Sequence, residues 1–148
     1  MTLKKTQAWK NLSKYIRQRD RKCFTCGAEA TEAGHFIHRN AATFFNEWNV
    51  HGQCYRCNRF LHGNLGEYAL RLEDKIGRKA IEELKKESQG IKRWSGKELK
   101  EIEKKYMSEI QINEKESKPK SRPQCKDHKL KFCTLCYPVK KGKAKRIV

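Results

Sequence analysis

Four cysteines in the first half of the chain have the spacing of a zinc site. They form two Cys-x2-Cys pairs, Cys23 with Cys26 and Cys54 with Cys57, and 27 residues separate the pairs. Thiolates at this spacing can converge tetrahedrally on Zn²⁺. The total of seven cysteines is odd, and the N-terminus lacks an apolar export segment, so metal-bound thiols are favoured over a disulfide framework. The pattern predicts a structural zinc.

The remaining three cysteines lie near the C-terminus together with a histidine. They follow the order Cys-x2-His-x4-Cys-x2-Cys, which predicts a second structural zinc on Cys125, His128, Cys133 and Cys136. The alternative is a set of reduced, solvated thiols, because the loop between the two halves is short for a zinc ribbon. Zinc would contribute folding free energy to a chain whose apolar fraction is only 36%.

Histidines and asparagines gather between and just after the N-terminal cysteine pairs. A histidine such as His35 can act as a general base toward water, and an amide or imidazole after Cys57 can hold a divalent cation against a phosphate. Asn58 and His62 are four residues apart, so a helix would place both on one face, where they could share a metal. The alternatives are packing roles for His35, His38, His51 and His62, and turn or capping roles for Asn49 and Asn58.

Charge predicts the class of partner. The formal net charge is +18, and residues 1–62 carry 11 basic and 4 acidic side chains, 63–112 carry 12 and 10, and 113–148 carry 12 and 3. Cations thus concentrate in the segments that hold the cysteines. Neutralising phosphates releases counterions, so nucleic acid is the expected partner. The expected contacts are basic side chains of these segments, namely Lys14, Arg17, Arg39, Arg56, Arg59, Lys140 and Lys141.

Membrane and secreted classes are disfavoured by the hydropathy pattern. No run of about 18 apolar residues occurs, and the mean hydropathy is −0.98. We therefore expect a cytoplasmic protein, in the cytoplasm of the bacterial host if a phage encodes it, with no membrane partner.

Apolar periodicity predicts a mainly helical α+β domain. An amphipathic helix is expected over Thr6 to Asp20, and a hairpin with a loop between Cys26 and Cys54. Further helices are expected from an Asn64 cap, with Glu67 reaching back and Gly77 as a stop, then on to Gly90, and from the capping box of Ser95 with Glu98 to about residue 112. Their apolar faces would be structural, or would form a homodimer interface.

The composition divides the chain into a domain, a linker and a tail. Residues 1–112 form the zinc-stabilised domain, of which 63–112 are a helical extension. Residues 113–124 contain two of the three prolines and several lysines but no large apolar side chain, which predicts a flexible linker. Residues 125–148 form the small basic tail with its own zinc. The basic run near the C-terminus either binds phosphate or is a solvated end.

The order of these motifs resembles a known nuclease superfamily. The motifs Cys-x2-Cys, Gly34-His35-Phe36, Asn49-Val50-His51-Gly52-Gln53-Cys54 and Cys57-Asn58 occur in the order of HNH (His-Me finger) endonucleases, whose ββα-metal element lies between zinc knuckles. More closely, Trp9 through Tyr68 is similar to the phage NinG (Rap) family of recombination endonucleases, and the helices to about residue 110 are compatible with that family. The zinc tail is not part of the resemblance.

The resemblance implies a role for individual residues. His35 would be the general base, Asn49 the amide that orients it, and Asn58 a ligand of a catalytic Mg²⁺ or Mn²⁺. Many related phage resolvases have a metal-binding aspartate immediately before the base, where this chain has Gly34. His62 is the first candidate for the missing ligand, with His38 and His51 behind it, and an imidazole ligand would favour a transition ion such as Mn²⁺.

Three classes of function follow from the sequence. The first is a metal-dependent, structure-selective DNA endonuclease acting on branched recombination intermediates such as Holliday junctions or D-loops, as the resemblance implies. The second is a non-catalytic zinc protein that binds nucleic acid or regulates transcription. The third is an adaptor whose helices recruit a recombination protein. A nuclease assay with and without Mn²⁺ separates the first class from the others.

Overall fold

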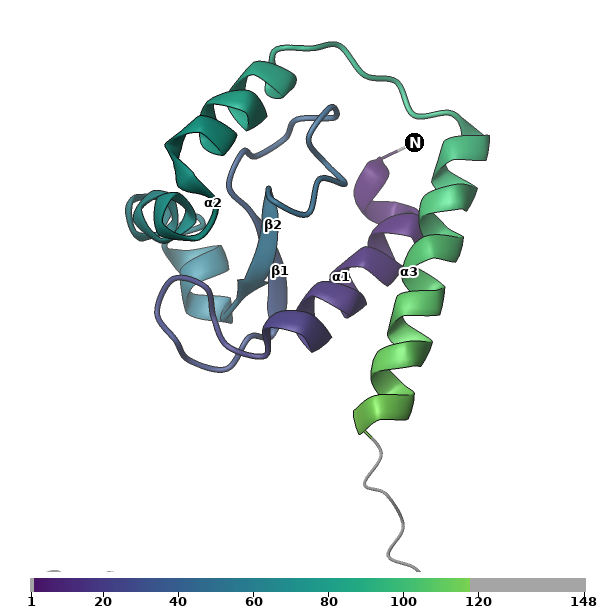
Figure 1. Cartoon of the computed structure of the whole chain (residues 1–148), viewed down its shortest axis with the longest axis horizontal. Helices are drawn as coiled ribbons and strands as arrows, with labels where there is room; N and C mark the ends of the chain where they lie inside the picture. The colour runs from purple at the N-terminus through teal and green to yellow at the C-terminus, as the bar shows by residue number, and fades with distance from the viewer. Residues whose placement is uncertain (1, 118–148) are drawn as a thin grey trace, which may run out of the picture. The chain divides into compact units, whose positions relative to one another are not determined.

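The structure, a computed structural model, describes residues 2–117, and it is an α+β fold that is mainly helical (Figure 1). The predictions for the second zinc, for Lys140 and Lys141 and for residues 118–124 of the linker lie outside the described residues. The elements, in chain order, are η1 (Leu3–Lys5), α1 (Gln7–Asp20), β1 (Glu32–His35), β2 (Val50–Gln53), η2 (Arg56–Phe60), α2 (Leu65–Ser88) and α3 (Gly96–Ser117). No helix within residues 2–117 combines the length and apolar character needed to cross a membrane.

Helix α1 begins where the sequence predicts. Thr6 is its N-cap, and its Oγ1 accepts a hydrogen bond from the Trp9 backbone N–H at 3.2 Å. Leu12 and Ile16 are fully buried, so the apolar stripe of the helix faces the core. Asp20 is its last residue, which confirms the predicted helix.

The predicted hairpin is confirmed as a two-stranded antiparallel sheet. Strands β1 and β2 pair Glu32 with Gln53 and His35 with Val50. Figure 1 shows the hairpin beside α1, with the loop of residues 36–49 above it. Asn49, which is fully buried, closes this loop. Its Oδ1 accepts from Ile37 N at 2.7 Å, and its Nδ2 donates to the carbonyls of Ile37 and Thr43 at 3.1 and 3.0 Å.

Helix α2 departs from the prediction at its N-terminal cap and confirms the predicted interruption at Gly77. Asn64 precedes the helix but makes no side-chain capping bond, because its backbone is left-handed (φ 49°) and its amide is directed to Cys57 Sγ at 3.9 Å. The predicted capping box with Glu67 is therefore wrong. Gly77 has φ 78° and ψ 159°, values that favour glycine. It breaks the helix into two straight parts, and the second part continues to Ser88.

Helix α3 confirms the second capping box and extends past the predicted end of the domain. Ser95 Oγ accepts from Glu98 N at 3.2 Å, and Glu98 Oε2 accepts from Ser95 N at 2.8 Å. The helix runs to Ser117, although the composition predicts a linker from residue 113. An ion pair of Lys14 with Glu114, at 2.8 Å, joins this last part of the helix to α1.

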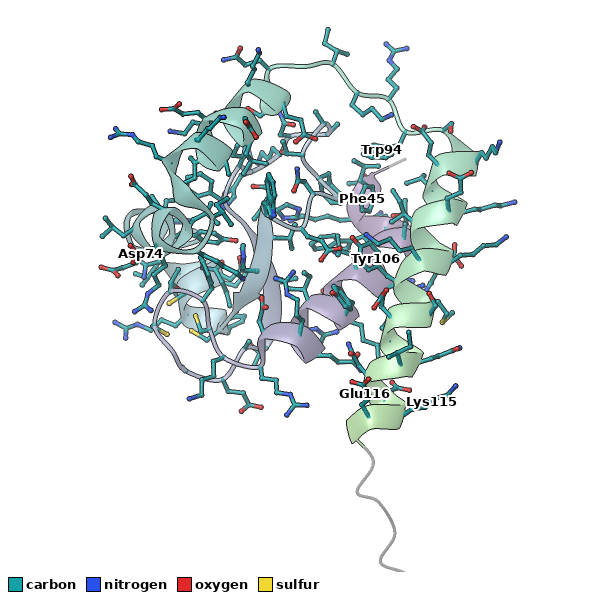
Figure 2. All side chains as sticks on the ribbon, in the orientation of Figure 1. Phe45, Asp74, Trp94, Tyr106, Lys115 and Glu116 are labelled. Atoms are coloured by element: carbon teal, nitrogen blue, oxygen red, sulfur yellow. The ribbon has the colours of Figure 1, made fainter. Side chains whose placement is uncertain are left out.

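Two apolar clusters lie on the two sides of the hairpin. The first joins α1, the loop after β1 and α3, and Figure 2 labels three of its members, Phe45, Trp94 and Tyr106. The Phe45 and Trp94 rings meet edge to face at 5.1 Å. The second cluster packs the two parts of α2 against each other and against Phe24 and Phe36, through Tyr68, Leu72, Ile81 and Leu84. The sheet is thereby held on both sides although each strand has only four residues.

Candidate functional site

The four N-terminal cysteines converge as predicted. Their sulfur atoms all lie within 4.8 Å of one another, with Cys23 and Cys57 buried and Cys26 exposed. Cys26 Sγ and Cys54 Sγ are 3.6 Å apart. Zinc–sulfur bonds of about 2.3 Å in a tetrahedron separate the sulfur atoms by about 3.8 Å. The cluster therefore has the composition and size of a site that could hold a structural metal such as zinc.

The surrounding backbone supports this cluster. Gly27 follows the first pair with φ 79°, and its N–H donates to Cys23 O at 2.9 Å, which closes a tight turn. The Cys57 N–H is directed at Cys54 Sγ at 3.5 Å. Four thiols this close cannot all ionise without a cation. Accordingly, the pKa of Cys26 rises to about 12: the Ala28 N–H lowers it, but burial and hydrogen bonds with the other three thiols outweigh that effect.

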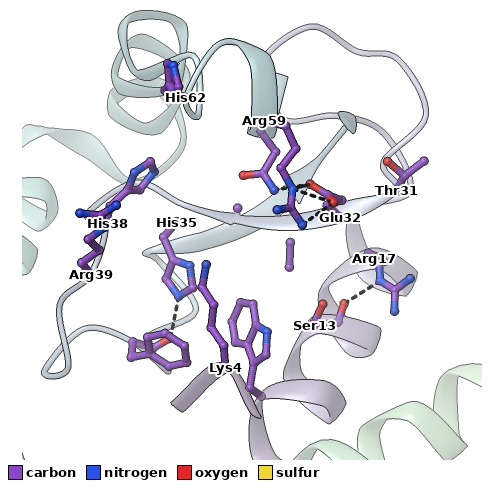
Figure 3. A pocket seen from close by; sticks show the side chains of 15 residues that line it. Lys4, Ser13, Arg17, Thr31, Glu32, His35, His38, Arg39, Arg59 and His62 are labelled. Carbon is purple, nitrogen blue, oxygen red and sulfur yellow. Dashed lines mark hydrogen bonds and ion pairs between the residues drawn. The ribbon is translucent and has the colours of Figure 1, made fainter. Parts of the chain in front are cut away.

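A pocket of about 540 Å³ opens beside the hairpin (Figure 3). Residues from η1, α1, β1, the loop after β1 and η2 meet around it. The predicted residues His35, His38, Asn58 and His62 all contribute to its lining. Its fixed charges are mainly positive, since Glu32 is its one acidic side chain against Lys4, Arg17, Arg39 and Arg59. Such a pocket suits an anionic group.

His35 is the most strongly buried histidine of this pocket. It is 8% exposed, and its ring stacks on the Trp9 ring with centroids 4.8 Å apart. Nε2 lies 3.1 Å from the carbonyl oxygen of Phe44. A carbonyl only accepts, so this bond assigns the proton to Nε2 and the lone pair to Nδ1. Burial lowers the pKa of His35 to about 4, so the ring is neutral near pH 7.

Asn58 faces Glu32 across the floor of the pocket. Asn58 Nδ2 donates to Glu32 Oε2 at 2.5 Å, and Arg59 forms an ion pair with the same carboxylate at 2.9 Å. The hydrogen bond from Arg59 lowers the pKa of Glu32. Glu32 is therefore an ionised acceptor that fixes the Asn58 amide, and Arg59, predicted to contact DNA, has its charge paired within the protein.

Asn58 and His62 do not share a helical face. The helical turn η2 ends at Phe60, and His62 has a positive φ of 47°. In Figure 3, His62 and His38 lie on one side of the pocket, away from the pair of Glu32 and Arg59. The helical spacing on which the pairing of Asn58 with His62 was based therefore does not apply, because the chain turns out of the helix between them.

Two other predicted residues have structural partners. His51 is 1% exposed, with Nδ1 2.9 Å from the Tyr68 hydroxyl and its ring stacked on Phe24 at 4.0 Å. Asn49 binds the loop backbone, and among the described residues the group that contacts the His35 ring nitrogen is the Phe44 carbonyl. Asn49 therefore acts on His35 only through the loop that carries Phe44.

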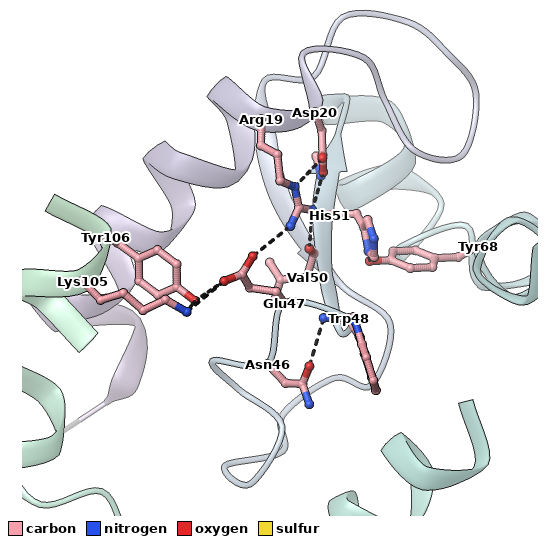
Figure 4. Close-up of polar contacts among 11 residues, drawn as sticks. Arg19, Asp20, Asn46, Glu47, Trp48, Val50, His51, Tyr68, Lys105 and Tyr106 are labelled. Atoms are coloured by element: carbon pink, nitrogen blue, oxygen red, sulfur yellow. Dashed lines mark hydrogen bonds and ion pairs between the residues drawn. The ribbon is translucent and has the colours of Figure 1, made fainter. Parts of the chain in front are cut away.

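A polar network fixes the hairpin to its helices (Figure 4). Arg19 forms ion pairs with Asp20 at 2.7 Å and Glu47 at 3.4 Å. Glu47 also accepts from the Tyr106 hydroxyl at 3.0 Å and pairs with Lys105 at 3.1 Å. The network connects the end of α1, the loop before β2 and α3, so the strand that leads to Cys54 has a fixed position.

Of the basic residues predicted to contact DNA, two line the pocket without a described ion pair. These are Arg17 and Arg39. Arg56 is exposed on η2, and Lys14 pairs with Glu114 of α3. The sequence analysis missed Lys4 and Glu32, which lie in the pocket. Glu32 is two residues before Gly34 in an extended segment, and period-two alternation would have placed both on one face of the sheet.

These features define the class of protein: a small α+β protein whose short hairpin is held by a four-cysteine site that could bind a metal. Comparison with known sequences is more specific. The family described as "Bacteriophage Lambda NinG protein" matches residues 2–116. The chain belongs to this family of phage proteins.

Individual relatives agree with this assignment. Protein ninG of Escherichia phage lambda is 35% identical over 111 residues, which cover 70% of this chain and 54% of the relative. Protein ninG of Salmonella phage P22 is 34% identical over 111 residues, covering 70% and 54%. The chain thus spans about half the length of the curated relatives it matches. No solved structure matches it significantly.

Proposed function

We propose that this protein is a metal-dependent DNA endonuclease of the HNH (His-Me finger) type. The observation that supports this most directly is the position of His35. It is a neutral, buried histidine at the end of β1. Its Nε2 bonds to the Phe44 carbonyl, which leaves the Nδ1 lone pair free, and the charged side chains of the pocket are mainly positive. A base held beside an anion-binding surface is what phosphodiester hydrolysis requires.

Several residues of the pocket have a role in this proposal. Trp9 and the Phe44 carbonyl fix the imidazole, so Nδ1 can take a proton from a water molecule that attacks phosphorus. The proton then resides on an imidazolium that the Phe44 carbonyl stabilises through Nε2. Lys4 and Arg17 reach the same pocket and would hold the phosphate against the base.

A divalent cation, Mg²⁺ or Mn²⁺, would stabilise the negative charge that develops on the phosphate and on the leaving oxygen. Asn58 is the residue best placed to bind it, since its amide lies in the pocket and is fixed by Glu32. The cysteine cluster would hold zinc for structure only, because four thiolates leave no open coordination position.

The substrate class follows from charge and from the resemblance. The surplus of positive charge favours DNA, and the resemblance favours branched recombination intermediates such as Holliday junctions or D-loops. Incision of two opposed strands would need two active sites, hence a homodimer. Exposed apolar side chains on α2 and α3, including Leu70, Met107 and Ile112, are available for that contact.

A second candidate is a non-catalytic zinc protein that binds nucleic acid. Tyr55 and Phe60 favour it, because both are more than half exposed and their rings pack edge to face at 5.5 Å beside the exposed Arg56. Exposed aromatic rings next to a cation are the surface on which unpaired bases stack. This surface is equally compatible with a nuclease that grips DNA near its pocket.

Cleavage of labelled linear, flapped and four-way DNAs with Mg²⁺ or Mn²⁺ tests the proposal. We expect incision of branched DNA by the native protein. His35→Ala should lose about 10² to 10⁴ in single-turnover rate while its DNA affinity stays nearly constant. His51→Gln is the matched control for a buried histidine outside the pocket. Absence of cleavage on every substrate, with tight binding retained, would favour the second candidate.

A further inference from the structure

The side chain of Gln53 has an oxygen without a hydrogen-bond partner. Gln53 is fully buried, and its Oε1 is one of two buried side-chain oxygens within residues 2–117 that accept no hydrogen bond. Leaving a buried acceptor unpaired costs about 1 to 3 kcal/mol. Native proteins keep few such atoms, and those they keep often have a ligand.

The other end of the same amide fixes its orientation. Gln53 Nε2 donates to the carbonyl of Gly63 at 2.8 Å and lies 3.4 Å from Thr25 Oγ1. Turning the amide over would set Oε1 against the Gly63 carbonyl, with no hydrogen between two acceptors. Oε1 is therefore held away from Gly63, on the side of Gly34.

Asn58 is oriented by the same logic. Its Nδ2 donates to the Glu32 carboxylate at 2.5 Å, and a carboxylate can only accept, so Oδ1 takes the opposite side of the amide. A Cβ added to Gly34 would lie 2.0 Å from Gln53 Oε1 and 2.9 Å from Asn58 Oδ1. Two amide oxygens therefore converge on the one residue of β1 that has no side chain.

We infer that Gln53 and Asn58 provide two ligands of a divalent-cation site next to Gly34, at the wall of the pocket. Converging oxygens with no donor between them attract a hard cation such as Mg²⁺ or Mn²⁺. Glu32 is a positioning residue, which fixes the Asn58 amide and adds a negative charge nearby. Gly34 leaves the space that Gln53 Oε1 occupies, and Gly34 and Asn58 both belong to the lining of the pocket.

This site deepens the proposed function, on which its chemical use rests, and it changes one expectation. The ligand that replaces an aspartate at position 34 is Gln53 from the neighbouring strand, and His62 is not required. In the hairpin register, Gln53 pairs with Glu32 and is the diagonal neighbour of Gly34 on the same face. The fold therefore delivers an oxygen to this point from β2.

Mn²⁺ titration of the ¹⁵N-labelled, zinc-loaded full chain without DNA tests the inference. Paramagnetic broadening detects even weak binding, and we expect the Gly34 backbone amide and the Asn58 side-chain amide to broaden first, with Mg²⁺ reversing the effect. Gln53→Met keeps the length of the side chain without its oxygen, and it should weaken Mn²⁺ binding about tenfold or more. His62→Ala should leave the affinity unchanged.

Gln18→Met is the matched control. Gln18 Oε1 is the other buried oxygen without a partner within residues 2–117, but Gln18 lies on α1 and is not among the atoms nearest to the Gly34 Cβ position. Its replacement should therefore leave Mn²⁺ binding as it is. The same spectra show whether each variant folds. If Gln53→Met does not, Gly34→Ala serves instead, because its Cβ would displace Gln53 Oε1 and should cause the same weakening.

Two results would overturn the inference: no broadening at Gly34 and Asn58 in the native protein, or equal Mn²⁺ affinity in the Gln53→Met and Gln18→Met variants. The proposed nuclease activity fails separately. If Mn²⁺ binds at Gln53 but the protein cuts no DNA, the metal site is supported and the proposed nuclease activity is contradicted. If the Gln53→Met variant cleaves DNA with an unchanged metal requirement, the nuclease activity is supported and the metal site at Gln53 is contradicted.

Discussion

Asp20, the last residue of α1, accepts a hydrogen bond from the Gly52 backbone N–H of β2 at 2.7 Å. Arg19 donates to both oxygens of the same carboxylate, at 2.7 and 2.9 Å, and to the Val50 carbonyl at 3.2 Å. One carboxylate therefore joins the first helix to the strand that carries Gln53 and ends next to Cys54. The position of the pocket floor depends on this junction.

Asp20→Ala should destabilise the protein by about 3 kcal/mol, because it leaves a half-buried Arg19 and a strand N–H without their partner. Urea unfolding followed by circular dichroism measures the change. Lys14→Ala is the control: its ion pair with Glu114 is about half exposed on both sides, and its removal should cost less than about 1 kcal/mol. Equal effects of the two variants would contradict the role given to Asp20.

His35 should make stability depend on pH in the acid range. Burial lowers its pKa to about 4 in the folded protein, against 6.5 for the ordinary side chain. Between these values the unfolded chain binds more protons, so stability falls as the pH drops through this window, by about 3 kcal/mol in all. His35→Asn removes this group and should flatten that part of the curve.

The comparison between native protein and His35→Asn isolates this effect. His51, whose pKa burial lowers to about 3, and the cysteine cluster contribute equally to both curves. Denaturant midpoints at pH 7 and pH 5 provide the measurement. Parallel curves for the two proteins would show that His35 is not buried in its neutral form.

Metal content should follow the cysteines. We predict two zinc ions for the full chain, one on the described cluster and one on the C-terminal set of Cys125, His128, Cys133 and Cys136. Cys54→Ser should release the first ion and lower the stability of the described domain, since a folding-coupled metal loses a ligand. Cys133→Ser should release the second ion alone. Elemental analysis and thermal unfolding of both variants distinguish the sites, and one zinc that Cys133→Ser does not alter would exclude the tail site.

Asn49→Ala should loosen the loop that carries the Phe44 carbonyl. The variant removes three hydrogen bonds between the buried amide and the backbone of Ile37 and Thr43, at a cost of about 2 to 4 kcal/mol. The chemical shift of His35 Nε2 should then move, because its carbonyl partner is no longer fixed. If the variant is destabilised but the His35 Nε2 chemical shift is unchanged, the loop does not control the environment of His35.

Residues 118–148 should strengthen DNA binding without taking part in cleavage. They carry 11 lysines and arginines against one aspartate. Truncation after Ser117 should weaken affinity and reduce the slope of log affinity against log salt by about 0.9 for each phosphate that the shortened chain no longer neutralises. Fluorescence anisotropy over a salt series measures this slope. An unchanged slope would assign DNA binding to residues 2–117 alone.

Local patterns predicted the elements of this fold well. The caps at Thr6 and Ser95 depend on hydrogen bonds to residues only three positions away, so the local sequence was sufficient to predict the helix starts. The spacing of the paired cysteines was likewise sufficient to predict their cluster. The Asn64 box failed because a positive φ turned that side chain toward Cys57. The end of α3 was missed because Lys14, a hundred residues earlier in the chain, pairs with Glu114. Contacts distant in sequence decided both cases.

The residues of the pocket also divide into those that the sequence predicted and those that depend on tertiary contacts. His35 and Asn58 were predicted from motif order, and both line the pocket. Glu32 belongs to no motif, and Gln53 stands in the motif order without an assigned role. The importance of both depends on the register of two four-residue strands. His62 was placed beside Asn58 by a helical spacing that the chain abandons after Phe60. A sequence can present candidate chemical groups, but only tertiary pairing decides which of them meet.

Because Gln53 approaches Gly34 so closely, we expect positions 34 and 53 to change together in evolution. A side chain at position 34 and a glutamine at position 53 compete for the same space, so neither can change first without harm to the site. Homologues with an aspartate before the histidine should therefore have a shorter residue in place of Gln53, and homologues with glycine should keep an amide or a carboxylate there. Covariation of these two columns would record, across phage genomes, two alternative ways of supplying one oxygen.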